Sequence, residues 1–266
     1  MPLARADLES LLRTRRLDRT LTTALPGVDP RDETAVAPAA HAGLDAYLGG
    51  GLPRGQLSEI VGARSSGRTS LLLQLAAAAT RRGELVALVD ALDALDAESA
   101  AAAGIDLARL LWVRGHVVTN PGLCGDLNQR ALEQALRAFT LVLQAGNFGL
   151  VVLDVAEAPL PALRRLPFTT WLRLQRMVEG TQTAALLVGT QPMARSSAGL
   201  TLQLGARGLG IGDSGLGGLG NGGAASGIRF GHSLFEGLTV EARVVRARSR
   251  EREDGCVTLS TRADCA

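Results

Sequence analysis

Short apolar runs alternate with amphipathic stretches through the middle of the chain. Strands are predicted at residues 56–61, 85–90, 110–113, 150–155 and 184–190, where mainly apolar runs have the length of a strand. Helices are predicted at 69–82, 123–145 and 168–180, and an alanine-rich helical stretch precedes 110–113. Parallel strands covered by helices on both faces carry such uninterrupted apolar runs. The pattern therefore predicts an α/β fold with a mostly parallel sheet flanked by helices.

The two ends of the chain have patterns of residue types that differ from the pattern in the middle. Residues 3–23 are predicted to form an amphipathic helix with leucines on one face, either packed on its own domain or docked on a partner. Residues 205–227 are too rich in glycine to order well, whereas 238–245 alternate as an antiparallel edge strand does. The expected organisation is a helical arm and linker (1–40), a core (41–204), a glycine-rich loop (205–227), and edge strands with a charged tail (228–266).

Composition narrows the class of protein. With 46% apolar and 20% charged residues, 266 residues suffice for one large core, and wholesale disorder is excluded. No apolar run approaches the ~18 residues of a membrane-spanning helix, and the first residues lack a secretory h-region, so a cytoplasmic protein is expected. Three cysteines (Cys124, Cys256, Cys265) and three distant histidines (His41, His116, His232) predict neither a disulfide framework nor a metal site. The net charge is only +2, so any contact with nucleic acid requires a local patch.

A phosphate-binding loop is predicted between the strand at 56–61 and the helix at 69–82. The motif GxxxxGK[ST] is matched in spacing by Gly62, Ala63, Arg64, Ser65, Ser66, Gly67, Arg68 and Thr69. In such a loop, backbone N–H groups and the helix N-terminus form a concave anion site. The glycines permit the tight turn, and the hydroxyl of Thr69 is the predicted Mg²⁺ ligand.

Arg68 stands where the motif has lysine, and all 28 basic residues of the chain are arginine. A lysine is a compact point charge, whereas arginine is longer, planar and suited to a fork-shaped partner. Phosphate affinity through the backbone and the guanidinium is compatible with this change. Fast hydrolysis is not expected. The predicted cofactor is therefore weakly bound ATP with Mg²⁺.

Residues 43–195 resemble the RecA family. The resemblance is carried by the Gly-Gly-Leu-Pro-x-Gly turn at Gly50–Gly55, by Glu59-Ile60 before the loop, and by the segments LVDALDALD, LVVLDV and LLVGTQ in the family's order. It implies a RecA-like P-loop core. It also implies that Asp154 is the Mg²⁺-associated acid and that Gln191 senses the γ-phosphate and leads into the DNA-binding loop.

Three departures from the RecA pattern concern catalysis. Leu92 occupies the position of the glutamate that activates water in the family, and leucine cannot act as a general base. Asp93, one residue later, is expected to point elsewhere. Ser99 falls where a tyrosine stacks on adenine, and the segment 157–167 shortens the loop between two core strands.

A shortened RecA relative with degraded nucleotide chemistry is similar to the ImuA family, whose members also resemble the division inhibitor SulA. Thr190–Ser196 and Leu234–Glu241 match segments typical of ImuA proteins. The resemblance implies an accessory of error-prone translesion synthesis. Its implied partners are an ImuB-type polymerase homologue, an error-prone replicative-type polymerase and RecA itself. Two alternatives stay open: a DNA-dependent ATPase and recombinase of RecA type, and a SulA-like interaction module.

Arginines gather near the predicted carboxyl ends of the strands, where α/β sheets bind ligands. They are Arg64, Arg68, Arg164, Arg165, Arg195 and Arg207. Singly, each is an ordinary solvated arginine. As a group they are compatible with weak DNA contact.

Overall fold

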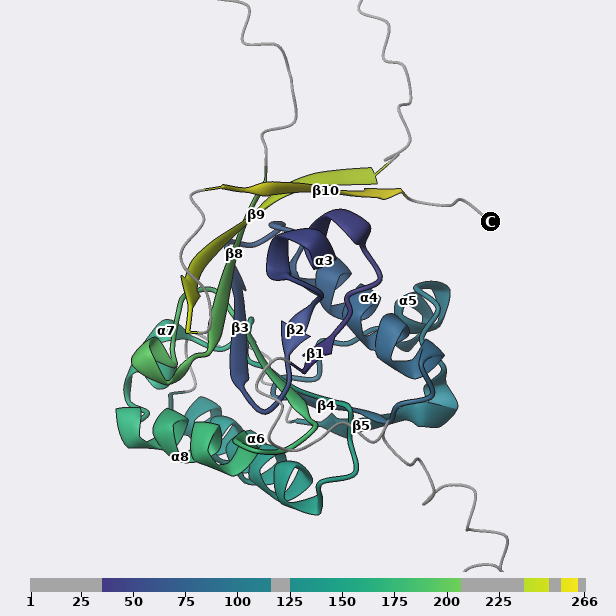
Figure 1. Ribbon diagram of the computed structural model, residues 1–266. Coiled ribbons are helices and arrows are strands. Elements are labelled where there is room, and N and C mark those ends of the chain that lie inside the picture. The colour runs from purple at the N-terminus through teal and green to yellow at the C-terminus, as the bar shows by residue number, and fades with distance from the viewer. Residues whose placement is uncertain (1–34, 116–124, 207–236, 249–254, 263–266) are drawn as a thin grey trace, which may run out of the picture.

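The computed structural model describes residues 35–115, 125–206, 237–248 and 255–262. Its main element is an eight-stranded sheet in the order β10-β9-β8-β3-β7-β6-β4-β5 (Figure 1). The strands are β3 (Leu57–Gly62), β4 (Val86–Asp90), β5 (Leu110–Arg114), β6 (Leu150–Asp154), β7 (Ala184–Gly189), β8 (Leu200–Ala206), β9 (Gly237–Ala247) and β10 (Val257–Arg262). The strands from β8 to β5 are parallel, β9 pairs antiparallel with β8, and β10 pairs antiparallel with β9. The predicted mostly parallel α/β fold is confirmed.

Helices cover both faces of the parallel sheet. Cluster 1, on one face, joins α3 (Ala42–Leu48), α4 (Arg68–Arg81) and α5 (Ala97–Ala102) to the strands. Cluster 2, on the other face, joins α6 (Gly125–Ala145), α7 (Leu160–Arg164) and α8 (Phe168–Val178) to the same strands. Leu186 belongs to cluster 1 and Leu187 to cluster 2, so successive residues of one strand fill both cores. This is why the core strands are apolar at nearly every position.

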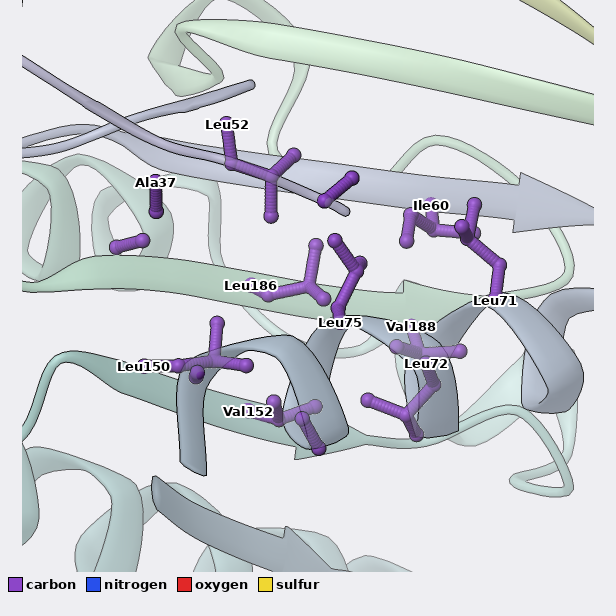
Figure 2. Packing of buried hydrophobic residues seen from close by; sticks show 14 of the residues in the cluster. Ala37, Leu52, Ile60, Leu71, Leu72, Leu75, Leu150, Val152, Leu186 and Val188 are labelled. Atoms are coloured by element: carbon purple, nitrogen blue, oxygen red, sulfur yellow. The ribbon is translucent and has the colours of Figure 1, made fainter. Parts of the chain in front are cut away.

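Cluster 1 shows how α4 is fixed to the sheet. Leu71, Leu72 and Leu75 of the helix lie against Ile60, Leu186, Val188 and Val152 of the strands (Figure 2). All these leucines are at most 4% exposed. Burying a leucine side chain stabilises a fold by about 1.5–3 kcal/mol. The start of α4, and the loop that precedes it, are therefore held at one fixed place above the sheet.

The region before the loop contains elements that the sequence analysis did not predict. They are α3 and a small antiparallel sheet formed by β1 (Val36–Ala37), which precedes α3, and β2 (Leu52–Pro53), which follows it. The helix begins because the Nδ1 of His41 accepts a hydrogen bond from the backbone of Leu44. It ends at Gly49, whose left-handed backbone (φ 69°) favours glycine.

The carboxyl-terminal strands confirm the prediction of an antiparallel edge. The alternating strand β9 lies between β8 and β10, and β10 is the outermost strand. Neither β8 nor β10 was predicted. The β9–β10 ribbon is tied to α3, because the Tyr47 hydroxyl donates to the Gly255 carbonyl (2.6 Å) and accepts from the Val244 N–H (3.2 Å). The ribbon passes over α3 in Figure 1.

Several predictions concern residues outside the described ranges. These are the helix at 3–23, nearly all of the glycine-rich segment, Arg207, His116, His232, Cys124 and Cys265. Within the described part of the chain, no helix combines the length and the apolar character needed to cross a bilayer. The described residues also contain no cluster of three or more histidine, cysteine or acidic side chains suited to a metal ion. The predicted domain boundaries stay predictions.

Candidate functional site

The predicted site residues meet at one edge of the sheet. The loop 62–69 follows β3, Leu92 follows β4, Asp154 ends β6, and Gln191 follows β7. The strands are parallel and in register, with Asp90 opposite Asp154 and Asp154 opposite Val188. Their carboxyl ends therefore open on the same side. This is the edge at which open α/β sheets bind ligands.

The loop between β3 and α4 has the backbone of a tight anion-binding turn. Gly67 precedes α4 with φ 85°, and Ser65 also has a positive φ of 60°. A Cβ at Gly62 would collide with the side chain of Ser66 and lie 2.6 Å from the carbonyl oxygen of Leu204. Glycine is thus required at 62 by close packing and at 67 by the left-handed backbone. The helix opens with its amino end at this loop, as predicted.

The side chains of the loop divide into exposed and buried groups. Ala63, Arg64, Ser65 and Thr69 are exposed, whereas Ser66 and Arg68 are buried. Ser66 Oγ and Arg68 Nη1 have no hydrogen-bond partner among the described residues. A buried donor without a partner costs about 1–3 kcal/mol. A phosphate oxygen would satisfy both atoms, so these residues fit an anionic phosphate group.

Arg64 differs from Arg68 in both partner and exposure. Its Nη2 donates to Glu157 Oε2 at 2.6 Å, and its side chain is 83% exposed. Glu157 lies in the segment after β6, so this ion pair bridges the loop and the neighbouring strand end. An exposed pair of this kind contributes about 0–1 kcal/mol. Arg68 is therefore the buried cation of the loop, and Arg64 belongs to its rim.

Asp154 is the predicted Mg²⁺-associated acid and lies beside Arg68. Its Oδ1 accepts a hydrogen bond from the Ala156 N–H at 2.9 Å. Burial raises the pKa of Asp154 from 3.8 to about 6, and the negative charges of Asp90 and Glu157 act in the same direction. The Ala156 hydrogen bond and the positive charge of Arg68 oppose the rise in pKa. A carboxyl group held in this way is readily ionised by a nearby cation.

We expect Asp154→Asn to stabilise the protein at pH 7 by about 1–3 kcal/mol. Between pH 4 and pH 6 the folded state holds a proton on Asp154 that the unfolded chain has lost, because the pKa is about 6 when folded and 3.8 ordinarily. The free energy of unfolding therefore falls as the pH rises through this interval, and asparagine removes that fall. Urea denaturation at several pH values measures it. Exposed Glu98→Gln is the control, and an identical pH profile for Asp154→Asn and the parent would contradict the expectation.

The residues at the positions that the RecA resemblance associates with catalysis each have other contacts. Leu92 packs against cluster 2. Asp93, with φ 56°, accepts two hydrogen bonds of 2.7 Å from Arg114, which lower the pKa of Asp93. Asp93 is thus engaged with β5, in agreement with the expectation that it points elsewhere. Ser99 is exposed and bonds with Asp96, the cap of α5.

The sequence analysis assigned no role to Glu59, which the structure makes central to this edge. Glu59 is completely buried, and its Oε1 accepts hydrogen bonds of 2.7 Å from the backbone of both Met193 and Ala194. Its Oε2 accepts from Thr201 Oγ1 at 3.0 Å. Glu59 thus ties β3 to the segment after Gln191 and to β8. A charged residue inside a mainly apolar strand was the signal that could have revealed it.

Three of the remaining predicted arginines lie in the described ranges. Arg164 and Arg195 line a pocket that also includes Gln191, which is exposed. Arg165 lies instead in a groove between α6 and α8. The rim is therefore basic, but its arginines do not form one continuous group.

Comparison with known proteins covers the part of the chain that carries the loop. Residues 24–164 match the RecA N-terminal domain family. RecA proteins of Clavibacter michiganensis and Salinispora tropica are each 40% identical to the chain over 136 residues, and that of Leifsonia xyli is 38% identical over the same length. These matches cover 51% of this chain and 34–35% of each relative, so the chain corresponds to about a third of their length.

The family match includes the loop 62–69, the strand ends after β4 and β6, and Asp154. The arrangement of these elements is the RecA-like α/β fold expected from the resemblance. The chain belongs to the RecA N-terminal domain family.

Proposed function

We propose that this chain is an ImuA-type accessory protein of DNA-damage tolerance, which acts through protein contacts and hydrolyses little or no ATP. Its proposed partners are an ImuB-type polymerase homologue, an error-prone replicative-type polymerase and RecA. The observation that carries the proposal is the combination of a RecA-type loop, in which Arg68 replaces lysine, with Leu92 at the position of the general base. The fold is retained while the group that activates water is missing.

The surroundings of Leu92 support a loss of hydrolysis. Leu92 packs on cluster 2, and the nearest acid in sequence, Asp93, is bonded to Arg114. A positioned general base contributes about 10²–10⁴-fold to a rate. Without one, no described side chain after β4 is placed to accept the proton of a water molecule at this edge.

The same loop supports binding of a nucleotide. Ser66 Oγ, Arg68 Nη1 and the amino end of α4 would hold the phosphates, and Thr69 with Asp154 would hold Mg²⁺. Bound Mg²⁺ neutralises charge on phosphoryl oxygens and orients them. The buried guanidinium adds positive charge in a low-dielectric place. We therefore propose weak ATP binding as a structural or regulatory property.

A DNA-dependent ATPase and recombinase of RecA type is the second candidate. It is favoured by the preserved turn at Gly62 and Gly67 and by the relatives, which are named RecA. It requires an alternative base, for which Glu157 is one acid near the loop, although Glu157 pairs with Arg64. A SulA-like interaction module stays a third reading.

ATP turnover by the purified chain separates the first two candidates. We expect no measurable increase in phosphate release on addition of single-stranded DNA, and the same background rate for the parent and for Asp154→Ala. A RecA protein assayed alongside verifies that the DNA and nucleotide are competent. Clear DNA-stimulated hydrolysis that Asp154→Ala abolishes would overturn the proposal in favour of the recombinase. Pull-down from damaged cells then distinguishes polymerase subunits from division proteins, and recovery of division proteins alone would favour the SulA-like reading.

A further inference from the structure

A pocket of about 410 Å³ lies between α7, the start of α8 and the segment that follows β7. Its floor is apolar. Leu163 and Trp171 in the floor are 7% and 3% exposed, and Phe168 stands at the rim with 37% exposure. The pocket is therefore a hollow with a buried apolar base and an accessible aromatic edge, which is the usual build of a ligand site.

The rim of the pocket is positively charged. Arg164 and Arg195 line it and are exposed, and neither forms an ion pair or a side-chain hydrogen bond with any residue in the described ranges. No acidic side chain is among the lining residues. The helix α8 also begins here, and no side chain caps its amino end. Two guanidinium groups without a partner among the described residues, together with the amino end of α8, favour a negatively charged occupant.

One wall of the pocket is fixed before any partner arrives. The backbone of Met193 is held by the buried carboxylate of Glu59. Arg195 has φ 48°, and the following Ser196 carbonyl accepts from Arg248 Nη2 at 3.2 Å. A non-glycine residue keeps such a backbone only where its surroundings impose it. A wall that is already ordered lowers the entropy cost of binding.

We propose that this pocket docks a peptide segment of a partner protein, with a leucine or phenylalanine inserted on the floor and aspartate or glutamate on the two arginines. The combination of an apolar base and a basic rim matches a peptide in which an apolar residue is followed by an acidic one. Single-stranded nucleic acid matches it less well, because base stacking uses exposed aromatic platforms. Of the two aromatic residues that line the pocket, Trp171 lies buried in the floor and only Phe168 is exposed, and two arginines neutralise about two phosphates.

Selection from a random twelve-residue peptide library displayed on phage tests the proposal with the full chain and no nucleotide. We expect the selected peptides to share an apolar residue within a few positions of an acidic one. The same selection on the double variant Arg164→Glu/Arg195→Glu is expected to return basic peptides. A charge-reversed rim that still selects acidic peptides, or a parent that selects no such consensus, would overturn the proposal.

Affinity of one selected peptide, measured by fluorescence polarisation, locates the contact. We expect a weakening of about tenfold or more for the double variant and for Phe168→Ala. Arg176→Glu, which reverses an exposed charge elsewhere on α8, is the matched control and is expected to bind within about twofold of the parent. Equal loss in all three variants, or displacement of the peptide by a twenty-nucleotide oligo-dT at similar concentration, would overturn the assignment to a peptide. The proposal goes beyond the proposed function. Because the peptide assays contain no nucleotide, a failure to bind peptide is distinguishable from a failure of the ATP-turnover test.

Discussion

An alanine at position 84 is expected to lower the free energy of unfolding by about 3–5 kcal/mol. Glu84 is 1% exposed and bonds to two arginines at the amino ends of the strands. Its Oε1 accepts from Arg54 Nη2 at 2.6 Å, and its two oxygens accept from Arg82 at 3.1 and 3.2 Å. Removing the carboxylate leaves the buried guanidinium of Arg54 without its counter-charge, which is the costly way to break a buried pair.

The two arginines connect Glu84 to several segments of the chain by further hydrogen bonds. Arg54 also donates to the carbonyls of Val36 and Gln182, and Arg82 donates to that of Pro38. Urea denaturation at pH 7 measures the effect, with exposed Glu133→Ala on α6 as the control, for which a change within about 0.5 kcal/mol is expected. A decrease of less than about 1 kcal/mol in Glu84→Ala would show that water replaces the carboxylate at no great cost.

Core elements could be predicted where a local sequence pattern was sufficient to identify the helix or strand. The strand β7 is a six-residue apolar run and is completely buried, and α4 begins one residue from its predicted start. The strand β10 was not predicted, because its six residues, Val257–Arg262, mix apolar and polar types after a run of charged residues. The helix α3 was not predicted, because its seven residues contain Gly43 and adjoin three glycines. These glycines indicate a turn unless the cap at His41 is considered.

The order of the strands could not be read from the chain. β8 follows β7 in sequence but pairs with β3, and β3 lies between them. Contacts that depend on this order were therefore missing from the sequence analysis. Thr201 reaches Glu59 because β8 and β3 are neighbours, with Thr201 opposite Glu59 in the register. Arg114 reaches Asp93 because β5 adjoins β4.

The site was predictable in its backbone and less so in its charges. The spacing of Gly62 and Gly67 specifies a turn whose geometry the structure reproduces. The burial of Arg68 follows from packing of the loop against the strand ends, which spacing does not describe. Polar groups buried at the carboxyl edge thus divide into two kinds. Glu59 has partners within the protein, whereas Ser66 and Arg68 each retain an atom that no described residue contacts by a hydrogen bond. The first kind stabilises the fold, and the second kind is suited to a ligand.

Glu59→Ala is expected to lower the free energy of unfolding by about 3–5 kcal/mol, because two backbone N–H groups and one hydroxyl lose their acceptor inside the protein. Glu59→Gln is expected to remain within about 1 kcal/mol of the parent. Its amide oxygen can accept from both Met193 and Ala194, and its NH₂ group can donate to the Thr201 hydroxyl, which accepts as readily as it donates. The role of Glu59 therefore depends on hydrogen bonds and not on its charge.

Amide hydrogen exchange separates this local role from a general loss of stability. In Glu59→Ala, the N–H groups of Met193 and Ala194 are expected to exchange faster by a larger factor than amides of β6, which report global unfolding. In Glu59→Gln both are expected to stay protected. Equal acceleration throughout the sheet would reduce Glu59 to a core residue. Selective acceleration at 193–194 would show that one buried acid on β3 holds the segment after Gln191, and with it a wall of the pocket, in place.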